Sequence, residues 1–181
     1  MENQRIRVTK RMLKDALVEL IQEKSIKKIS VYEICELAKV NRTTFYKYYG
    51  SQHDLLEDME RDVFEELEHR LEIRNNSARE AIIRLAKYVE DDRKKFKALL
   101  NSTSDVSFAD KISSHPLTQM YMDESFKNYP ANQVDYIRSF ICNGGYAVLR
   151  RWVNADIRQP PEEMANLIVG LVSSLVGKEI T

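Results

Sequence analysis

Residues 30–49 decide the fold, and they read SVYEICELAKVNRTTFYKYY. Ser30 is followed three residues later by Glu33, the spacing of a capping box that opens a helix. Apolar residues at helical spacing continue from there until a break at residues 39–41. A second, short helix is expected over residues 42–49, directly before a glycine. The stretch therefore predicts a helix, a short turn and a second helix.

The second helix of this pair has one apolar face and one hydrogen-bonding face. Phe45 and Tyr49 are four residues apart, so both can face a core together with Val40. The opposite face carries Arg42, Thr43, Tyr46 and Lys47. Arginine can make two hydrogen bonds to guanine, and threonine offers base edges a hydroxyl and a methyl group. This composition suits a helix that reads the major groove, although an ordinary amphipathic helix pair has the same spacing.

With its flanking residues, this stretch closely resembles the helix-turn-helix of the TetR family of transcriptional regulators. The resemblance is carried by VNRTTFYKYY at residues 40–49, by Ser51 and by the leucine pair at residues 55–56. Upstream, ALVELI at residues 16–21 and ISVYEI at residues 29–34 are similar to the family's first helix and the start of its second. The resemblance covers roughly the first 60 residues and implies a DNA-binding domain.

The resemblance implies a role in DNA binding for a small set of residues. Those on the family's base-reading and groove-facing positions are Arg42, Thr43, Thr44, Tyr46 and Lys47. Tyr48 falls where the family places an aromatic or histidine side chain against phosphate, and Ser30 falls at a helix N-terminus with the same role. Free amides and the helix dipole attract phosphate at such an end. Because base contacts specify and phosphate contacts position, we expect the sequence code to come from residues 42–47.

The chain departs from the family pattern at two places. Lys39 occupies a turn position where the family often has glycine. A lysine there is expected either in a left-handed conformation, at a cost of roughly 1–2 kcal/mol, or in a different turn. Gln52 and His53 follow Ser51, where the family usually has a lysine. One charge-assisted phosphate contact is therefore absent from the expected set.

The rest of the chain predicts an all-α fold of about nine helices. The 181 residues include only five glycines and four prolines, which disfavours a sandwich or barrel rich in tight turns. Apolar periodicity and capping signals predict further helices over residues 9–23, 51–73, 77–89, 93–100, 132–155 and 161–178. We expect a helix-turn-helix domain over residues 1–52 and a helical effector-binding and dimerisation domain over residues 53–181.

The last two helices are expected to form a homodimer through residues 132–178. The segment resembles the C-terminal domain of TetR regulators common in Gram-positive bacteria, in which these helices pair across a twofold axis into a four-helix bundle. Gly144 and Gly145 should each cost a helix roughly 1 kcal/mol relative to alanine, which close approach of a partner helix would offset. Gly170, Ser174 and Gly177 form a second small-residue seam. The alternative is that these glycines only loosen the helices of a monomer.

Aromatic residues in the second domain are candidates for lining an effector pocket: Phe96, Phe108, Tyr121, Phe126, Tyr136 and Phe140. The alternative is that they are simply core residues. Glu65, His69 and Glu72 share a helical face, but zinc sites usually need more histidine or cysteine, so we expect no metal and no cofactor. No nucleophile, base and orienting group converge, and no glycine-rich phosphate loop is present, so no catalytic residue is expected.

Charge is distributed unevenly along this neutral chain. Residues 1–50 hold 11 lysines and arginines against 6 acidic residues, whereas residues 51–181 hold 17 against 22. A basic end is expected where a protein meets phosphate, although an uneven solvated surface has the same composition. The start, MENQR, lacks the apolar stretch of a signal peptide, and the longest apolar run, residues 167–176, is too short for a bilayer. Cys35 and Cys142 are expected as buried, reduced thiols in a cytoplasmic protein.

Together these features predict a dimeric, sequence-specific transcriptional regulator, either a repressor released by an effector or an activator engaged by one. Its partners are expected to be a palindromic double-stranded DNA operator and a small-molecule or protein effector, with no membrane. The rival interpretations are a helical interaction module that no longer binds DNA, which the departures at Lys39 and Gln52 would favour, and a helical-bundle enzyme.

Overall fold

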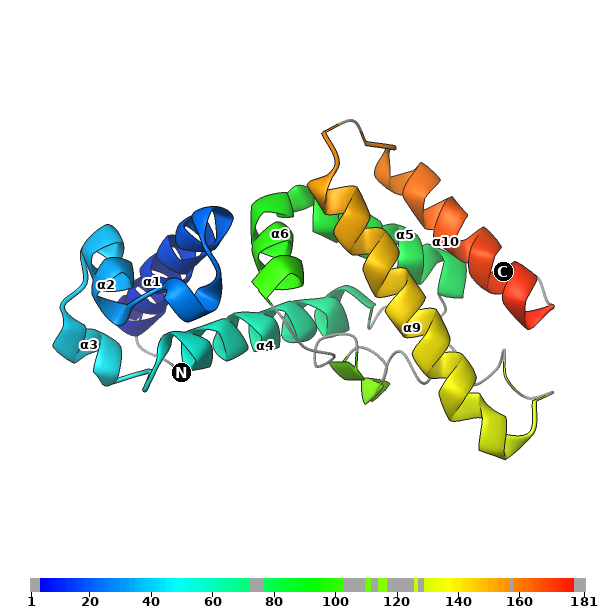
Figure 1. Cartoon of the computed structure of the whole chain (residues 1–181), viewed down its shortest axis with the longest axis horizontal. Coiled ribbons are helices and arrows are strands. Elements are labelled where there is room, and N and C mark those ends of the chain that lie inside the picture. Colours follow the sequence, from blue (N-terminus) through cyan, green and yellow to red (C-terminus); the bar gives the residue numbers. More distant parts are fainter. Residues whose placement is uncertain are drawn as a thin grey trace. The chain divides into compact units, whose positions relative to one another are not determined.

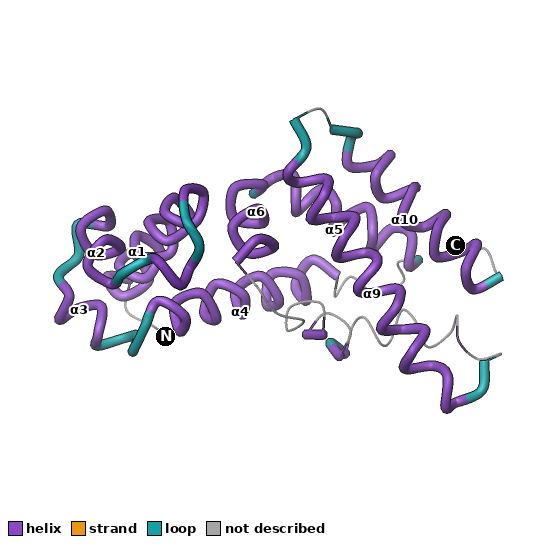
Figure 2. Tube along the Cα trace, in the orientation of Figure 1, coloured by secondary structure: helices purple, strands orange, loops and turns teal. Residues whose placement is uncertain are grey.

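The structure is a computed structural model of the chain, and it describes residues 4–71, 77–102, 110–111, 114–116, 126, 129–156 and 158–177. Within these residues all regular secondary structure is helical, comprising eight α-helices and one 3₁₀ helix (Figure 2). The all-α prediction is confirmed. The chain divides into two compact units, Met1–Glu65 and Glu66–Thr181. This division lies inside helix α4, Gln52–Leu71, whereas the domain boundary expected from the sequence is at residue 52.

The first unit holds α1 (Gln4–Glu23), η1 (Ile26–Lys28), α2 (Val31–Ala38), α3 (Arg42–Tyr46) and the first part of α4 (Figure 1). Its core is built from fully buried apolar side chains, including Leu13, Leu17, Ile34, Phe45 and Leu55. Leu55 and its neighbours Leu56, Met59 and Val63 explain why the unit extends into α4. Helix α1 begins at Gln4, five residues before the expected Thr9. The apolar residues before Thr9, Ile6 and Val8, are two apart, so no helical period predicts this extra turn.

The second unit holds the end of α4 together with α5 (Ala78–Asp91), α6 (Arg93–Ser102), α9 (Ala131–Asn154) and α10 (Pro161–Val176). Helix α5 lies side by side with α10, and α6 packs against α9 (Figure 1). Lys87 pairs with Glu162 at 2.8 Å, and Arg79 donates to Asn166 at 2.7 Å, so polar contacts as well as apolar ones join α5 to α10. The predicted helix ends agree within two residues, except that Ile73 and Lys178 lie outside the described residues.

Arg93 closes the C-terminal end of α9. Its Nε donates to the carbonyl of Val153 and its Nη2 to the carbonyl of Ala155, both at 2.9 Å. A helix end has carbonyls without intrahelical partners, and a cation there also favours the helix dipole. Cys35 and Cys142 are both buried, and the two thiols form no disulfide, as expected. In the described part of the chain, no helix has the length and hydropathy needed to cross a membrane.

Candidate DNA-binding site

Helix α2 begins at the capping box that the sequence predicts. Ser30 Oγ accepts a hydrogen bond from the Glu33 amide at 3.3 Å, and the Ser30 amide donates to Glu33 Oε2 at 3.0 Å. The Ser30 hydroxyl also donates to that oxygen at 2.8 Å, and Lys24 pairs with the same carboxylate. The hydrogen bond from Lys24, followed by those from Ser30, lowers the pKa of Glu33 to about 2. Ser30 is exposed, but its hydroxyl is engaged in the cap of its own helix.

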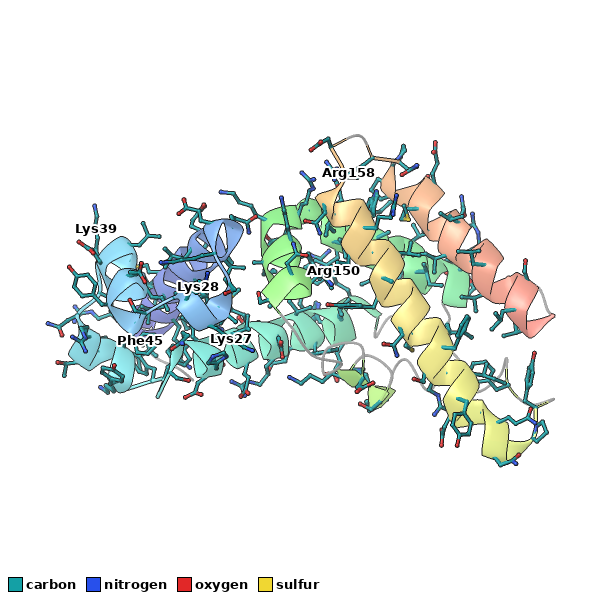
Figure 3. The ribbon with its side chains drawn as sticks, viewed as in Figure 1. Lys27, Lys28, Lys39, Phe45, Arg150 and Arg158 are labelled. Carbon is teal, nitrogen blue, oxygen red and sulfur yellow. The ribbon has the colours of Figure 1, made fainter. Side chains whose placement is uncertain are left out.

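The turn between α2 and α3 depends on a lysine in the left-handed region. Lys39 has φ 53° and ψ 40°, and its amide closes α2 by donating to the carbonyls of Cys35 and Glu36. Of the two expected outcomes for this departure from the family, the left-handed conformation is therefore the observed one. The Lys39 side chain is exposed and points away from the core (Figure 3). Asn41 then caps α3, because its Oδ1 accepts from the Thr43 amide at 2.8 Å.

Helix α3 has the two faces that its sequence predicts. Phe45 is fully buried and Tyr49 is 5% exposed, and their rings are in contact with centroids 5.6 Å apart (Figure 3). The exposed residues on and beside the helix are Arg42, Thr43, Tyr46 and Lys47, while Thr44 is half-buried. Regular helix ends at Tyr46, three residues earlier than expected, and the amides of Tyr48 and Tyr49 continue the turn by sharing the carbonyl of Phe45.

Tyr48 lies between two lysines at the end of this turn. Its side chain is half-buried, with Lys10 Nζ 6.0 Å and Lys47 Nζ 5.9 Å from the centroid of its ring. Both distances are at the outer limit of a cation–π contact, so the lysines act here chiefly as positive charges. Lys10 belongs to α1, which means that two helices bring positive charge to one phenol. This surface is suited to an anion such as a backbone phosphate.

Two exposed lysines beside α2 were not among the predicted site residues. Lys27 and Lys28 form η1 together with Ile26, and they project from the surface because Ile26 and Ile29 are buried (Figure 3). They stand directly before the N-terminus of α2, where phosphate contact is expected. The signal available in the sequence was the run KSIKKIS at residues 24–30, with three lysines between apolar positions.

An ionic cluster around the buried carboxylate of Asp58 was also missed. Asp58 on α4 is 8% exposed, and its Oδ2 accepts from the Tyr49 hydroxyl at 2.7 Å and from Lys14 Nζ, on α1, at 2.7 Å. Arg61 pairs with the other carboxylate oxygen, and Lys14 reaches Asp62 at 2.6 Å as well. Burial raises the pKa of Asp58, but the donors from Lys14, Arg61 and Tyr49 outweigh it, so the pKa is well below its usual range.

Of the six predicted effector residues, the structure describes four, and two of these are buried while two are exposed. Phe96 and Phe126 are buried at 3% exposure, whereas Tyr136 and Phe140 are 79% and 66% exposed on α9. Within the chain, Tyr136 and Phe140 therefore do not share an enclosed pocket with the buried aromatics. Phe108 and Tyr121 lie outside the described residues, as does Glu72 of the alternative metal site. No group of three or more metal-ligating side chains occurs in the described ranges.

An open hollow of about 830 Å³ adjoins α6 and α9 in the second unit. Its lining includes Arg150, labelled in Figure 3, together with Asn101, Tyr146 and Asn154. Asn101 Oδ1 accepts from Arg150 Nε at 3.1 Å and from Asn154 Nδ2 at 3.2 Å, so the polar lining groups bond largely to one another. The lining also includes the aromatic ring of Tyr146 and two alanines, but none of the six aromatic residues expected to line an effector pocket.

Comparison with known proteins identifies the class to which this fold and site belong. Residues 13–59 match the tetR family of bacterial regulatory proteins, and residues 76–174 match a transcriptional regulator C-terminal region. The chain therefore belongs to the TetR family of transcriptional regulators. Regulators of this family control transcription by binding DNA operators, act as dimers and bind small-molecule effectors.

The chain is similar in sequence to two named bacterial regulators. It is 23% identical over 169 residues to the uncharacterized HTH-type transcriptional regulator YxbF of Bacillus subtilis, covering 89% of this chain and 44% of YxbF. The chain thus spans less than half the length of that relative. It is 24% identical over 146 residues to DhaS of Lactococcus lactis, the transcriptional activator of the dhaKLM operon, covering 78% of this chain and 75% of DhaS.

Among solved structures, a TetR transcriptional regulator from Streptococcus agalactiae has a TM-score of 0.69 and 24% identity. That alignment covers 93% of this chain and 96% of the other. DhaS itself aligns with a TM-score of 0.61 at 21% identity, with the same two coverages of 93% and 96%. At these identities the likeness concerns the fold.

Proposed function

We propose that the chain binds a palindromic operator as a homodimer and reads it through α3. The observation that carries this proposal is the two-sided character of α3. Phe45 is fully buried while Arg42, Thr43, Tyr46 and Lys47 face solvent. The exposed groups include donors and methyls that match base edges in the major groove. Of the two helices in the pair, α3 is therefore the recognition helix, and α2 braces it across the backbone.

The proposed contacts fall into two kinds. Arg42, Thr43, Thr44, Tyr46 and Lys47 read base edges, with Arg42 offering two hydrogen bonds to a guanine. Tyr48 holds a phosphate, a role that the positive charges of Lys10 and Lys47 beside its ring support. Ser30 contributes through the N-terminus of α2 more than through its hydroxyl, because that hydroxyl is bonded to Glu33.

The proposed dimer forms through residues 132–178. On α9, Tyr136 and Phe140 are exposed, and on α10 so are Leu167, Leu171 and Leu175, at 50%, 54% and 45%. These residues recur at spacings of four, so each helix carries an apolar outer stripe that a second copy of the chain would cover. A twofold axis through this interface would place the two α3 helices on half-sites about 34–36 Å apart. That geometry requires a palindromic operator.

The proposed effector acts through the helical domain after residue 52. Its binding would change the separation of the two recognition helices and so move them on or off successive major grooves. An effector that releases the operator makes the chain a repressor, and one that favours operator binding makes it an activator, the role that DhaS has in its own operon. We place this regulation in the cytoplasm, with no catalytic step, no metal and no cofactor.

The experiment that tests this function begins with selection of bound sequences from random DNA by the purified protein. Arg42→Ala should then relax the preference at one base pair per half-site and weaken operator binding by about 1–3 kcal/mol. Tyr48→Phe should weaken binding to all sequences alike, because a phosphate contact carries no sequence information. Affinities for the operator, its single-base variants and random DNA would measure both effects. Unchanged operator affinity in both variants would show that α3 is not the recognition helix.

A further inference from the structure

The buried carboxylate of Asp58 holds the end of the recognition helix without lying on its DNA-facing side. We propose that Asp58 is a positioning residue: through the Tyr49 hydroxyl it fixes the orientation of α3, and this orientation determines how strongly the chain prefers its operator to other DNA. The inference rests on the proposed function, because it concerns how α3 reads bases. It adds residues that meet no base or phosphate themselves.

Helix α3 needs an external anchor because it is short. Its regular part, Arg42–Tyr46, has five residues, which is less than two turns and too few to hold a helix by its own hydrogen bonds. Phe45 anchors one side by packing in the core. A ring buried among apolar atoms can rotate or slide by small amounts, so Phe45 alone leaves the roll of the helix poorly fixed.

Tyr49 supplies the second anchor. Its amide bonds to the Phe45 carbonyl at 2.9 Å, which makes it a continuation of the same turn. Its ring packs on Phe45, and its hydroxyl reaches Asp58 Oδ2 at 2.7 Å, a short distance typical of a hydrogen bond to a charged acceptor. A directional bond at the far end of a rigid ring restricts rotation of the turn to which that ring belongs.

Asp58 is itself held by a partner from another helix and by one on the next turn of its own helix. Lys14 on α1 and Arg61 on α4 bind the carboxylate, so its two oxygens are shared among α1, α4 and the end of α3. Burying ionised groups in this way adds little net stability compared with apolar side chains of the same shape. What the cluster adds is geometry, because each donor must meet the carboxylate at a defined distance and angle.

Fixed geometry matters more for base reading than for phosphate contact. A bidentate hydrogen bond weakens steeply when its angle changes, so a small roll of α3 would disrupt the contact proposed for Arg42. Attraction to phosphates falls off gradually with distance and depends little on angle. Loosening the Tyr49–Asp58 bond should therefore lower operator affinity while leaving affinity for random DNA almost unchanged.

The test compares two tyrosine variants that delete the same atom one residue apart. Tyr49→Phe removes only the buried hydroxyl and should lower the ratio of operator to random-DNA affinity about tenfold. Tyr48→Phe, the matched control, should lower both affinities together and leave the ratio within about twofold of the wild type. Each affinity is measured on the full-length chain by fluorescence anisotropy, at a temperature where circular dichroism shows the variants to be folded.

A second pair of variants tests the carboxylate. Asp58→Asn should also lower the ratio, whereas Glu57→Gln, which removes the neighbouring exposed charge of α4, should not. The double variant, Tyr49→Phe with Asp58→Asn, should have a ratio of operator to random-DNA affinity within about twofold of that of whichever single variant has the lower ratio. The reason is that both changes act on one contact. Independent effects that multiply in the double variant would contradict a shared contact.

The outcomes separate this inference from the function on which it rests. Two results would overturn the inference while the wild type still prefers its selected operator. In the first, Tyr49→Phe keeps the wild-type ratio of operator affinity to random-DNA affinity. In the second, Tyr49→Phe loses both affinities in step with a lower melting temperature, which would make Asp58 and Tyr49 merely structural. A wild type that binds every sequence equally contradicts the proposed function and this inference together. A loss of ratio in Tyr49→Phe with normal folding is the result that supports it.

Discussion

Replacing Lys39 with glycine should stabilise the DNA-binding unit. Lys39 has φ 53°, in the left-handed region where Cβ approaches the following carbonyl oxygen. That conformation costs a residue other than glycine roughly 1–2 kcal/mol. The exposed side chain forms no ion pair among the described residues that would offset the cost, and the backbone bonds that close α2 need no side chain.

The expected gain is smaller than the strain, because glycine also has more freedom to lose on folding. That entropic cost is roughly 0.5–1 kcal/mol, which leaves a net stabilisation of about 0.5–1 kcal/mol. For a chain of this size, about 1 kcal/mol raises the melting temperature by roughly 2–4 °C. Lys39→Gly should therefore melt about 1–4 °C above the wild type.

Circular dichroism at 222 nm would follow melting of the full-length chain at fixed protein concentration, so that dimerisation contributes equally to each variant. Lys39→Ala is the matched control: it removes the same charge but keeps Cβ, and it should melt close to the wild type. The difference between glycine and alanine isolates the backbone effect. Equal melting temperatures for these two variants would refute the strain assigned to Lys39.

Two further predictions concern the dimer and the ionic cluster. Gly144→Leu and Gly170→Leu should each weaken dimerisation in light scattering, although leucine favours a helix. An added Cβ at either position would meet no described atom within 4 Å beyond its chain neighbours and its own helix backbone, so the clash would be with the partner. A wild type that is monomeric at micromolar concentration would contradict this. The pKa of Asp58 is lower in the folded chain than in the unfolded chain, so its carboxylate stabilises the fold at pH values above the ordinary aspartate pKa of about 4. This contribution is lost as the pH falls toward the folded pKa. The difference in urea midpoint between wild type and Asp58→Asn should therefore shrink on acidification from about pH 6 to pH 3, and a constant difference would contradict the role of the charge.

The features that were predictable from the sequence are local ones. The capping box joins Ser30 to Glu33, and the turn conformation belongs to Lys39 alone, so both depend on residues within one helical turn. The inward orientation of Phe45 follows from helical period for the same reason. In each case the interacting groups are fixed by spacing along the chain. The structure confirms the capping box and the inward Phe45, and at Lys39 it shows the left-handed conformation, one of the two alternatives that the sequence left open.

The ionic cluster could not be predicted because its members are far apart in the sequence. Lys14 and Asp58 are 44 residues apart, and Tyr49 reads from the sequence as a core aromatic like Phe45. Nothing in the period of α4 distinguishes Asp58 from Glu57, which is exposed. The partner of a buried charge is chosen by how α1 packs against α4, and that packing is a property of the folded unit.

The aromatic residues of α9 show a different limit of prediction from sequence. Their helical spacing was clear, but the sequence did not show what would cover them. An apolar stripe predicts that something covers it, and a pocket, a core and a second subunit all meet that condition. Tyr136 and Phe140 are largely exposed, and Gly144 continues their spacing of four along the same face of α9. A partner helix on this face would bury the two rings and approach the helix backbone at the glycine. One proposed interface thus accounts both for two largely exposed aromatic rings and for a glycine that otherwise only weakens its helix.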